Sequence, residues 1–154
     1  MIEWTISRVA TSAVVLVIAL SVLGLFGMEA ASVRQMELRG LADSVSDLVA
    51  DVDMLPCAVS LEVNLTASAE AFGLPRAFHG DAYVIELTEE RPYVVWHGDR
   101  VAGHPFPSRV RLVDRTGAPV SVLVVRSVSG FVISSEPEWA EWGLDLPISI
   151  SPLG

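Results

Sequence analysis

The sequence predicts an α+β protein in which a long N-terminal helix packs on a C-terminal antiparallel β-sheet domain. No proline lies between Met1 and Leu55, and the apolar residues of this region follow helical spacing. From Cys57 onward, apolar and polar residues alternate in short runs separated by turn residues, which is typical of antiparallel strands. We therefore predict a helix over residues 1–56 and a β-rich domain over residues 57–154.

Composition limits the class of protein. The chain has 154 residues, of which 51% are hydrophobic and 19% are charged, so disorder of the whole chain is excluded. The net charge is -9 and the ten basic residues are all arginine, which argues against nucleic acid as a partner because phosphate binding needs clustered positive charge. The single cysteine, Cys57, excludes an intramolecular disulfide and a multi-cysteine zinc site.

The first part of the helix is apolar on every side. Residues 9–28 contain no charge and are bounded by Arg8 and Glu29. At 1.5 Å per residue this run spans about 30 Å, the thickness of the hydrocarbon core of a bilayer. Trp4 and Arg8 suit the headgroup region. The run therefore predicts a transmembrane span over residues 9–28.

Two other interpretations of this run are disfavoured by the sequence. A cleaved signal peptide, with residues 30–32 as its cleavage site, is disfavoured because the run exceeds the usual apolar length and Glu29 adjoins the site. A buried core helix is disfavoured because no polar face is left for water. Arginines flank the run on both sides, so they do not decide its orientation. The acidic C-terminal bulk and a glycosylation pattern favour a cytoplasmic N-terminus and an extracellular C-terminal domain at the cell membrane.

The second part of the helix is amphipathic, and Pro56 ends it. Its apolar positions are spaced by three and four residues and form one stripe. The stripe packs either on the domain that follows or on neighbouring copies, as an assembly contact. Small residues at 24, 27 and 31 would also allow close approach between helices in a bilayer. The stripe consists of Leu38, Leu41, Val45, Leu48, Val52 and Leu55.

The β-rich domain is expected to form a sandwich or one strongly curved antiparallel sheet. A tight II′ turn is expected at Gly98 and Asp99. The two most apolar strands, at 120–125 and 128–133, are expected to be central, and residues 139–142 are expected to help close the domain. The expected strands cover residues 59–66, 83–87, 92–96, 100–104, 110–112, 120–125, 128–133 and 146–150.

Catalytic chemistry finds little support in the sequence. Phosphate-loop, hydrolase and metalloprotease motifs are absent, so we expect no enzyme and no cofactor. Cys57 is interpreted as a small buried apolar residue rather than a nucleophile. A zinc site is a weak hypothesis, since its spacing matches no known metal motif; its candidate ligands are His79, His97, Asp99 and His104.

Asn64, Leu65 and Thr66 fit the acceptor pattern for N-glycosylation. They fall at the end of the first expected strand, where Asn64 and Thr66 lie on its polar face. Attached sugar would be tolerated there if that side of the domain lies outside the cell.

The layout resembles archaeal type IV pilin-like proteins. The resemblance is carried by Glu3, the apolar residues 9–28, the amphipathic residues 32–55 and the β-rich residues 59–150. It implies that apolar helices bundle into a filament core, that the heads face outward, and that Glu3 is the acidic residue typical of the mature N-terminus. Family members carry a basic leader that is cut before the apolar segment, and no such site precedes Val9. The chain either starts near a processed end or is not processed.

The expected function is therefore that of a non-enzymatic, membrane-anchored cell-surface protein. It would be a pilin-like subunit or a minor component of a type IV pilus-like assembly. Its partners would be membrane lipid and either copies of itself or other pilin-like subunits, with no nucleic acid. The alternative is a single-pass anchored β-domain that acts as a binding or accessory subunit of a membrane complex.

Overall fold

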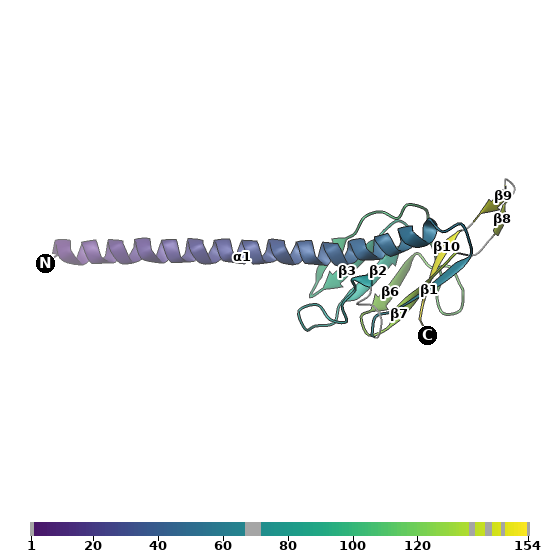
Figure 1. Ribbon diagram of the computed structural model, residues 1–154. Coiled ribbons are helices and arrows are strands. Elements are labelled where there is room, and N and C mark those ends of the chain that lie inside the picture. Colours follow the sequence, from purple (N-terminus) through teal and green to yellow (C-terminus); the bar gives the residue numbers. More distant parts are fainter. Residues whose placement is uncertain (1, 67–71, 136–137, 141–142, 146, 154) are drawn as a thin grey trace. The chain divides into compact units, whose positions relative to one another are not determined.

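A computed structural model of the protein describes residues 2–66, 72–135, 138–140, 143–145 and 147–153 (Figure 1). The chain divides into two compact units, Met1–Glu37 and Leu38–Gly154. One long helix and two four-stranded sheets confirm the α+β expectation. The elements are α1 (Ile2–Asp53), β1 (Val59–Asn64), β2 (Val84–Thr88), β3 (Pro92–Trp96), β4 (Asp99–Ala102), β5 (Arg111–Leu112), β6 (Val122–Arg126), β7 (Gly130–Ser135), β8 (Glu138–Ala140), β9 (Gly143–Asp145) and β10 (Ile148–Pro152).

Helix α1 is 52 residues long, close to the length expected from the absence of proline. It ends at Asp53, before Pro56, and its last turn tightens where the Leu55 N–H donates to the Val52 carbonyl at 3.2 Å. Leu55 therefore lies outside the helix and is 41% exposed. Its inclusion in the apolar stripe was wrong because the helical period stops before it.

The second half of α1 belongs to the Leu38–Gly154 unit and supplies one side of its core (Figure 1). All the stripe residues except Leu55 are buried, and Ala42 and Val49 widen the stripe to a full helix face. The stripe thus packs within the chain, and the compact unit begins at residue 38 although the predicted β-rich domain begins at 57. The buried helix residues are Leu38, Leu41, Ala42, Val45, Leu48, Val49 and Val52.

The first sheet has the order β1-β7-β10-β5, and the second has the order β4-β3-β2-β6. All neighbouring strands are antiparallel except β5 and β10, which are parallel, so the expectation of a wholly antiparallel sheet was wrong at this pair. The Val120 N–H donates to the Leu112 carbonyl at 2.9 Å, and Val113 bridges to Pro119. These contacts join the end of the first sheet to the chain entering β6.

The two most apolar strands take different positions in the sheets. Strand β7 lies inside its sheet, as expected, whereas β6 is the last strand of the second sheet. On β6 the residues alternate between exposed and buried, and Val124 is 56% exposed. Apolar composition therefore did not identify a central strand here, because valine favours any half-buried pleated surface.

The turn between β3 and β4 differs from the expected type. Its central residues are His97 and Gly98, with φ values of 49° and 90°, and Asp99 already pairs with Trp96 as the first residue of β4. Two successive positive φ values define a type I′ turn, in which glycine at the second position is unstrained.

The last strands are also shifted along the chain. Ser127 and Ser129 form the turn after β6, so β7 begins at Gly130, two residues later than expected. Strands β8 and β9 pair with each other, and β10 is the strand that joins the first sheet. Residues 141 and 142 of the expected closing segment lie outside the described residues.

Tyr83 is a core residue that forms hydrogen bonds with Pro75 and Ser127. Its ring is buried, its hydroxyl donates to the Pro75 carbonyl at 2.7 Å, and its backbone pairs with Ser127. Because burial disfavours the phenolate, it raises the pKa of Tyr83 to about 12.

We predict that alkali destabilises the protein through this residue. The unfolded chain loses the tyrosine proton near pH 10, whereas the folded chain keeps it to about pH 12. The stabilisation is complete below pH 10 and is lost between pH 10 and 12. Tyr83→Phe should remove this loss and cost about 0.5–1.5 kcal/mol at pH 7, because the hydrogen bond to Pro75 disappears.

Urea unfolding in detergent, followed by tryptophan fluorescence from pH 7 to 12, measures this effect. The chain has no lysine, so no lysine side chain titrates in this window. An unchanged alkaline loss in Tyr83→Phe would contradict the assignment to Tyr83.

Candidate functional site

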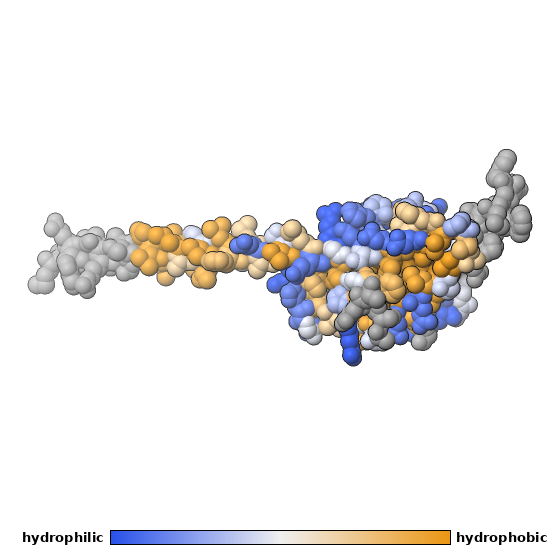
Figure 2. Space-filling view, in the orientation of Figure 1, coloured by the Kyte–Doolittle hydropathy of each residue, from blue (hydrophilic) through white to orange (hydrophobic). Residues whose placement is uncertain are grey.

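The apolar stretch of α1 is the surface least suited to water. Along residues 14–28 the large apolar side chains are exposed on every side of the helix, including Leu20 at 61% and Phe26 at 65%. The part of the helix whose side chains are described, Val14–Asp53, contains a window with a mean hydropathy of 2.3 that is 0% buried. By length and composition, the helix is long and apolar enough to cross a membrane. Figure 2 shows this apolar surface along α1. A core helix of similar composition would be mostly buried.

Polar groups within this stretch are satisfied locally. The Ser21 hydroxyl donates to the Val17 carbonyl one turn earlier, at 2.8 Å. A serine bonded in this way exposes no free donor to hydrocarbon, so it is compatible with a lipid environment. Gly24 and Gly27 have open space where a Cβ would lie.

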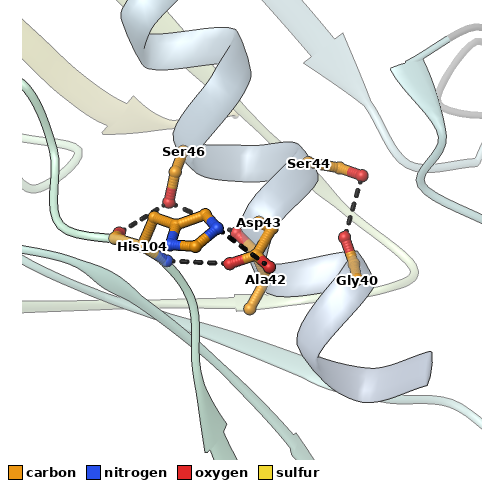
Figure 3. A network of polar contacts seen from close by, with 6 residues as sticks. All are labelled: Gly40, Ala42, Asp43, Ser44, Ser46 and His104. Carbon is orange, nitrogen blue, oxygen red and sulfur yellow. Dashed lines mark hydrogen bonds and ion pairs between the residues drawn. The ribbon is translucent and has the colours of Figure 1, made fainter. Parts of the chain in front are cut away.

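A polar network fixes the amphipathic part of α1 to the loop after β4 (Figure 3). The His104 N–H donates to Asp43 Oδ1 at 2.8 Å, and His104 Nε2 lies 3.4 Å from Asp43 Oδ2. The Ser46 hydroxyl donates to the His104 carbonyl at 2.8 Å. Both polar groups of the His104 backbone are thus paired with side chains of the helix.

The loop follows the helix closely. Gly103 packs against Ala42, and the Ser108 hydroxyl donates to Asp53 Oδ1 at 3.1 Å. The helix rises about 16 Å from Ala42 to Asp53, and five extended residues from Gly103 to Ser108 cover about the same distance. Pro105 and Pro107 restrict the backbone of this loop and remove donors that would otherwise need partners. Residues 103–108 therefore form a helix-bound loop.

The sequence-predicted histidines do not form a metal centre. His97 Nε2 lies 2.9 Å from Asp81 Oδ2, and His104 contacts Asp43. No group of three histidine, cysteine, aspartate or glutamate side chains able to hold a metal occurs among the described residues. The zinc hypothesis therefore finds no support there, since each of these two histidines pairs with a different aspartate.

A repeated turn escaped the sequence analysis. Phe78, His79, Gly80 and Asp81 adopt the same turn as residues 96–99, with φ values of 51° and 90° at its centre. The two turns meet through the His97–Asp81 contact, and the Phe78 and Trp96 rings lie edge to face at 5.1 Å. The repeated order of aromatic, histidine, glycine and aspartate was the signal that could have identified it.

The structure also places Cys57 and Asn64, two further residues singled out in the sequence. Cys57 is exposed, so its interpretation as a buried apolar residue was wrong; it follows the end of α1 in a bend rather than in the core. Asn64 is the last residue of β1, and its side-chain Oδ1 accepts hydrogen bonds from the Thr66 N–H and hydroxyl.

The contact between the helix-bound loop and α1 yields a matched pair of variants. A Cβ on Gly103 would lie 2.6 Å from the Ala42 carbonyl oxygen, which is backbone and moves only with the helix. Gly103→Ala should therefore lower stability by about 1–3 kcal/mol. Gly40→Ala meets nothing within 4 Å and should raise stability by about 0.5–1 kcal/mol, because glycine weakens a helix interior. Urea midpoints in detergent measure both changes, and equal midpoints for the two variants would contradict the close contact.

Comparison with protein-family models, with curated proteins and with solved structures finds no match for the chain.

Proposed function

We propose that the protein is a non-enzymatic, single-pass membrane protein whose C-terminal domain lies outside the cell, and that it acts as a pilin-like subunit or minor component of a filamentous surface assembly. The observation that supports the proposal most is the all-round exposure of apolar side chains on α1, between residues 14 and 28.

The energetics of this stretch favour lipid over water. An exposed valine, leucine or phenylalanine gains about 1.5–3 kcal/mol when its side chain is fully transferred out of water. More than ten large apolar side chains of α1 are exposed in this way. In water such a surface would drive aggregation, whereas in a bilayer it would contact the hydrocarbon chains of the lipid.

The compact unit Leu38–Gly154, called the head below, carries the polar surface that an aqueous compartment requires. Acidic and basic side chains pair on its surface, as in Arg100 with Glu86 at 2.7 Å and Arg109 with Glu89 at 2.9 Å. With a net charge of -9, the chain has no basic excess that would retain its head at an anionic cytoplasmic leaflet. This balance supports an extracellular head.

The proposed assembly uses the apolar stretch rather than the amphipathic stripe. Residues 38–52 of the stripe are already buried in the head core and offer no surface to a second copy. Gly24 and Gly27 would permit close approach between the helices of neighbouring subunits. Contacts between copies are therefore assigned to the apolar stretch.

Insertion is tested by placing charge in the apolar stretch. Ile18→Asp combined with Leu20→Asp should move the protein from the alkali-resistant membrane fraction to the soluble or aggregated fraction, because each central aspartate costs about 2.5–3.5 kcal/mol. Met36→Asp, an exposed residue outside the predicted span, is the matched control and should leave the protein in the membrane. Labelling of the single, exposed Cys57 by an impermeant maleimide on intact cells should report an external head. Membrane retention of the double variant, or protection of Cys57, would contradict the proposal.

Assembly is tested with the full chain after detergent is removed in the presence of lipid. The wild type should form filaments or higher oligomers by negative-stain microscopy, and Gly24→Leu with Gly27→Leu should abolish them. Both leucines have open space in the monomer, so the urea midpoint of the head should stay unchanged. A wild type that remains monomeric would favour the alternative, an anchored binding or accessory subunit.

A further inference from the structure

We propose that Asn64 is the acceptor of an N-linked saccharide, transferred from a polyprenyl phosphate-linked or diphosphate-linked sugar donor. The inference rests on the proposed function in one respect, because such a transfer requires the head to lie outside the cell. It adds a modification site that the proposed anchoring and assembly do not need.

The strand places Asn64 toward solvent. In β1 the side chains alternate, and Val63 and Leu65 on either side of Asn64 are fully buried in the core. Asn64 is partly exposed and Thr66 is exposed. Strand β1 pairs with β7 at the end of its sheet, so Asn64 lies at the last residue of an outer strand. A saccharide on this side would point away from the core.

The hydrogen bonds fit the acceptor role. Asn64 Oδ1 accepts from the Thr66 hydroxyl at 2.6 Å and from the Thr66 N–H at 3.0 Å. Both donors act on the carbonyl oxygen, so the turn holds the amide and the hydroxyl in one fixed arrangement. The acceptor pattern of asparagine, any residue other than proline, and threonine thus forms a compact turn that a transferase can recognise.

The transfer balances with the donor named. A bond forms between Asn64 Nδ2 and C1 of the sugar, and the bond between C1 and the phosphate oxygen breaks. The lipid phosphate leaves with the electron pair of the broken bond, and Nδ2 gives up one proton to a base of the transferase. No oxidant or reductant is required.

The chain carries its own control for this geometry. Asp114 Oδ1 accepts from the Thr116 hydroxyl at 2.6 Å and from the Thr116 N–H at 2.8 Å, which is the arrangement found at Asn64. The same bonds lower the pKa of the exposed Asp114 carboxyl, the Thr116 hydroxyl contributing most. A carboxylate has no nitrogen to glycosylate, but Asp114→Asn would supply one in an equivalent turn of the same head.

The test uses the full chain, inserted during translation into endoplasmic reticulum microsomes, which contain the donor and the transferase. The wild type should show a one-glycan shift in gel mobility that an N-glycan amidase removes. Asn64→Gln and Thr66→Ala should lose the shift, Thr66→Ser should retain it, and Asp114→Asn should show a two-glycan shift. In protein from the cells that encode it, the arginine-bounded peptide 40–76 should carry the saccharide mass on Asn64.

The outcomes separate the inference from the proposed function. A single glycan on Asp114→Asn with none on the wild type would overturn the role of Asn64 and leave the topology intact. Absence of glycan on both proteins, with Cys57 labelled from the lumenal side, would also overturn the inference alone. Absence of glycan on both, with Cys57 protected, would contradict the external head and the inference together. An unmodified peptide 40–76 in the encoding cells, despite an external head, would overturn the modification.

Discussion

The fold depends on the burial of one helical stripe in the core of the head. Leu38, Val45 and Val52 lie seven residues, or about two turns of α1, apart, and each is fully or almost fully buried. Without the helix, the apolar side of the two sheets would face water, because the same core cluster contains residues of both. The stripe therefore completes the head, and the helix-bound loop holds it in register through Asp43 and Ser46.

This constraint also explains why the two parts of one helix have different roles. From residue 38 onward its apolar face packs in one core with residues of both sheets, and polar residues such as Asp47 and Asp51 remain exposed. Before residue 37 the apolar side chains have no matching protein surface among the described residues. Under the proposed function, a bilayer supplies these apolar surroundings.

Local patterns predicted the parts of the fold that local chemistry determines. The absence of proline predicted the long helix, the spacing at Leu38 and Leu41 predicted its buried face, and alternation predicted β1 and β2. Non-local pairing was not predictable in this way. The parallel contact of β5 with β10 joins segments more than thirty residues apart, and no period in either segment encodes it.

Among the site residues, contacts between neighbours in the sequence were also predictable, whereas contacts between distant residues were not. The Asn64 turn depends on three consecutive residues and was visible as a motif. The partners of His97 and His104 lie 16 and 61 residues away along the chain. The closeness of the histidines and Asp99 in the sequence therefore suggested a weak metal-site hypothesis, which finds no support among the described residues. Cys57 was misjudged because its small apolar character says nothing about a bend after a helix.

The most direct measurement is a nitroxide scan along α1 in lipid nanodiscs containing one copy of the chain, on a Cys57→Ser background. The account predicts high oxygen accessibility at every position from 14 to 28, with no helical period. From 38 to 52 it predicts a period near 3.6 residues, with the stripe positions protected. A helical period of protection within residues 14–28 of the single copy, or access of a water-soluble relaxer on all sides there, would contradict it.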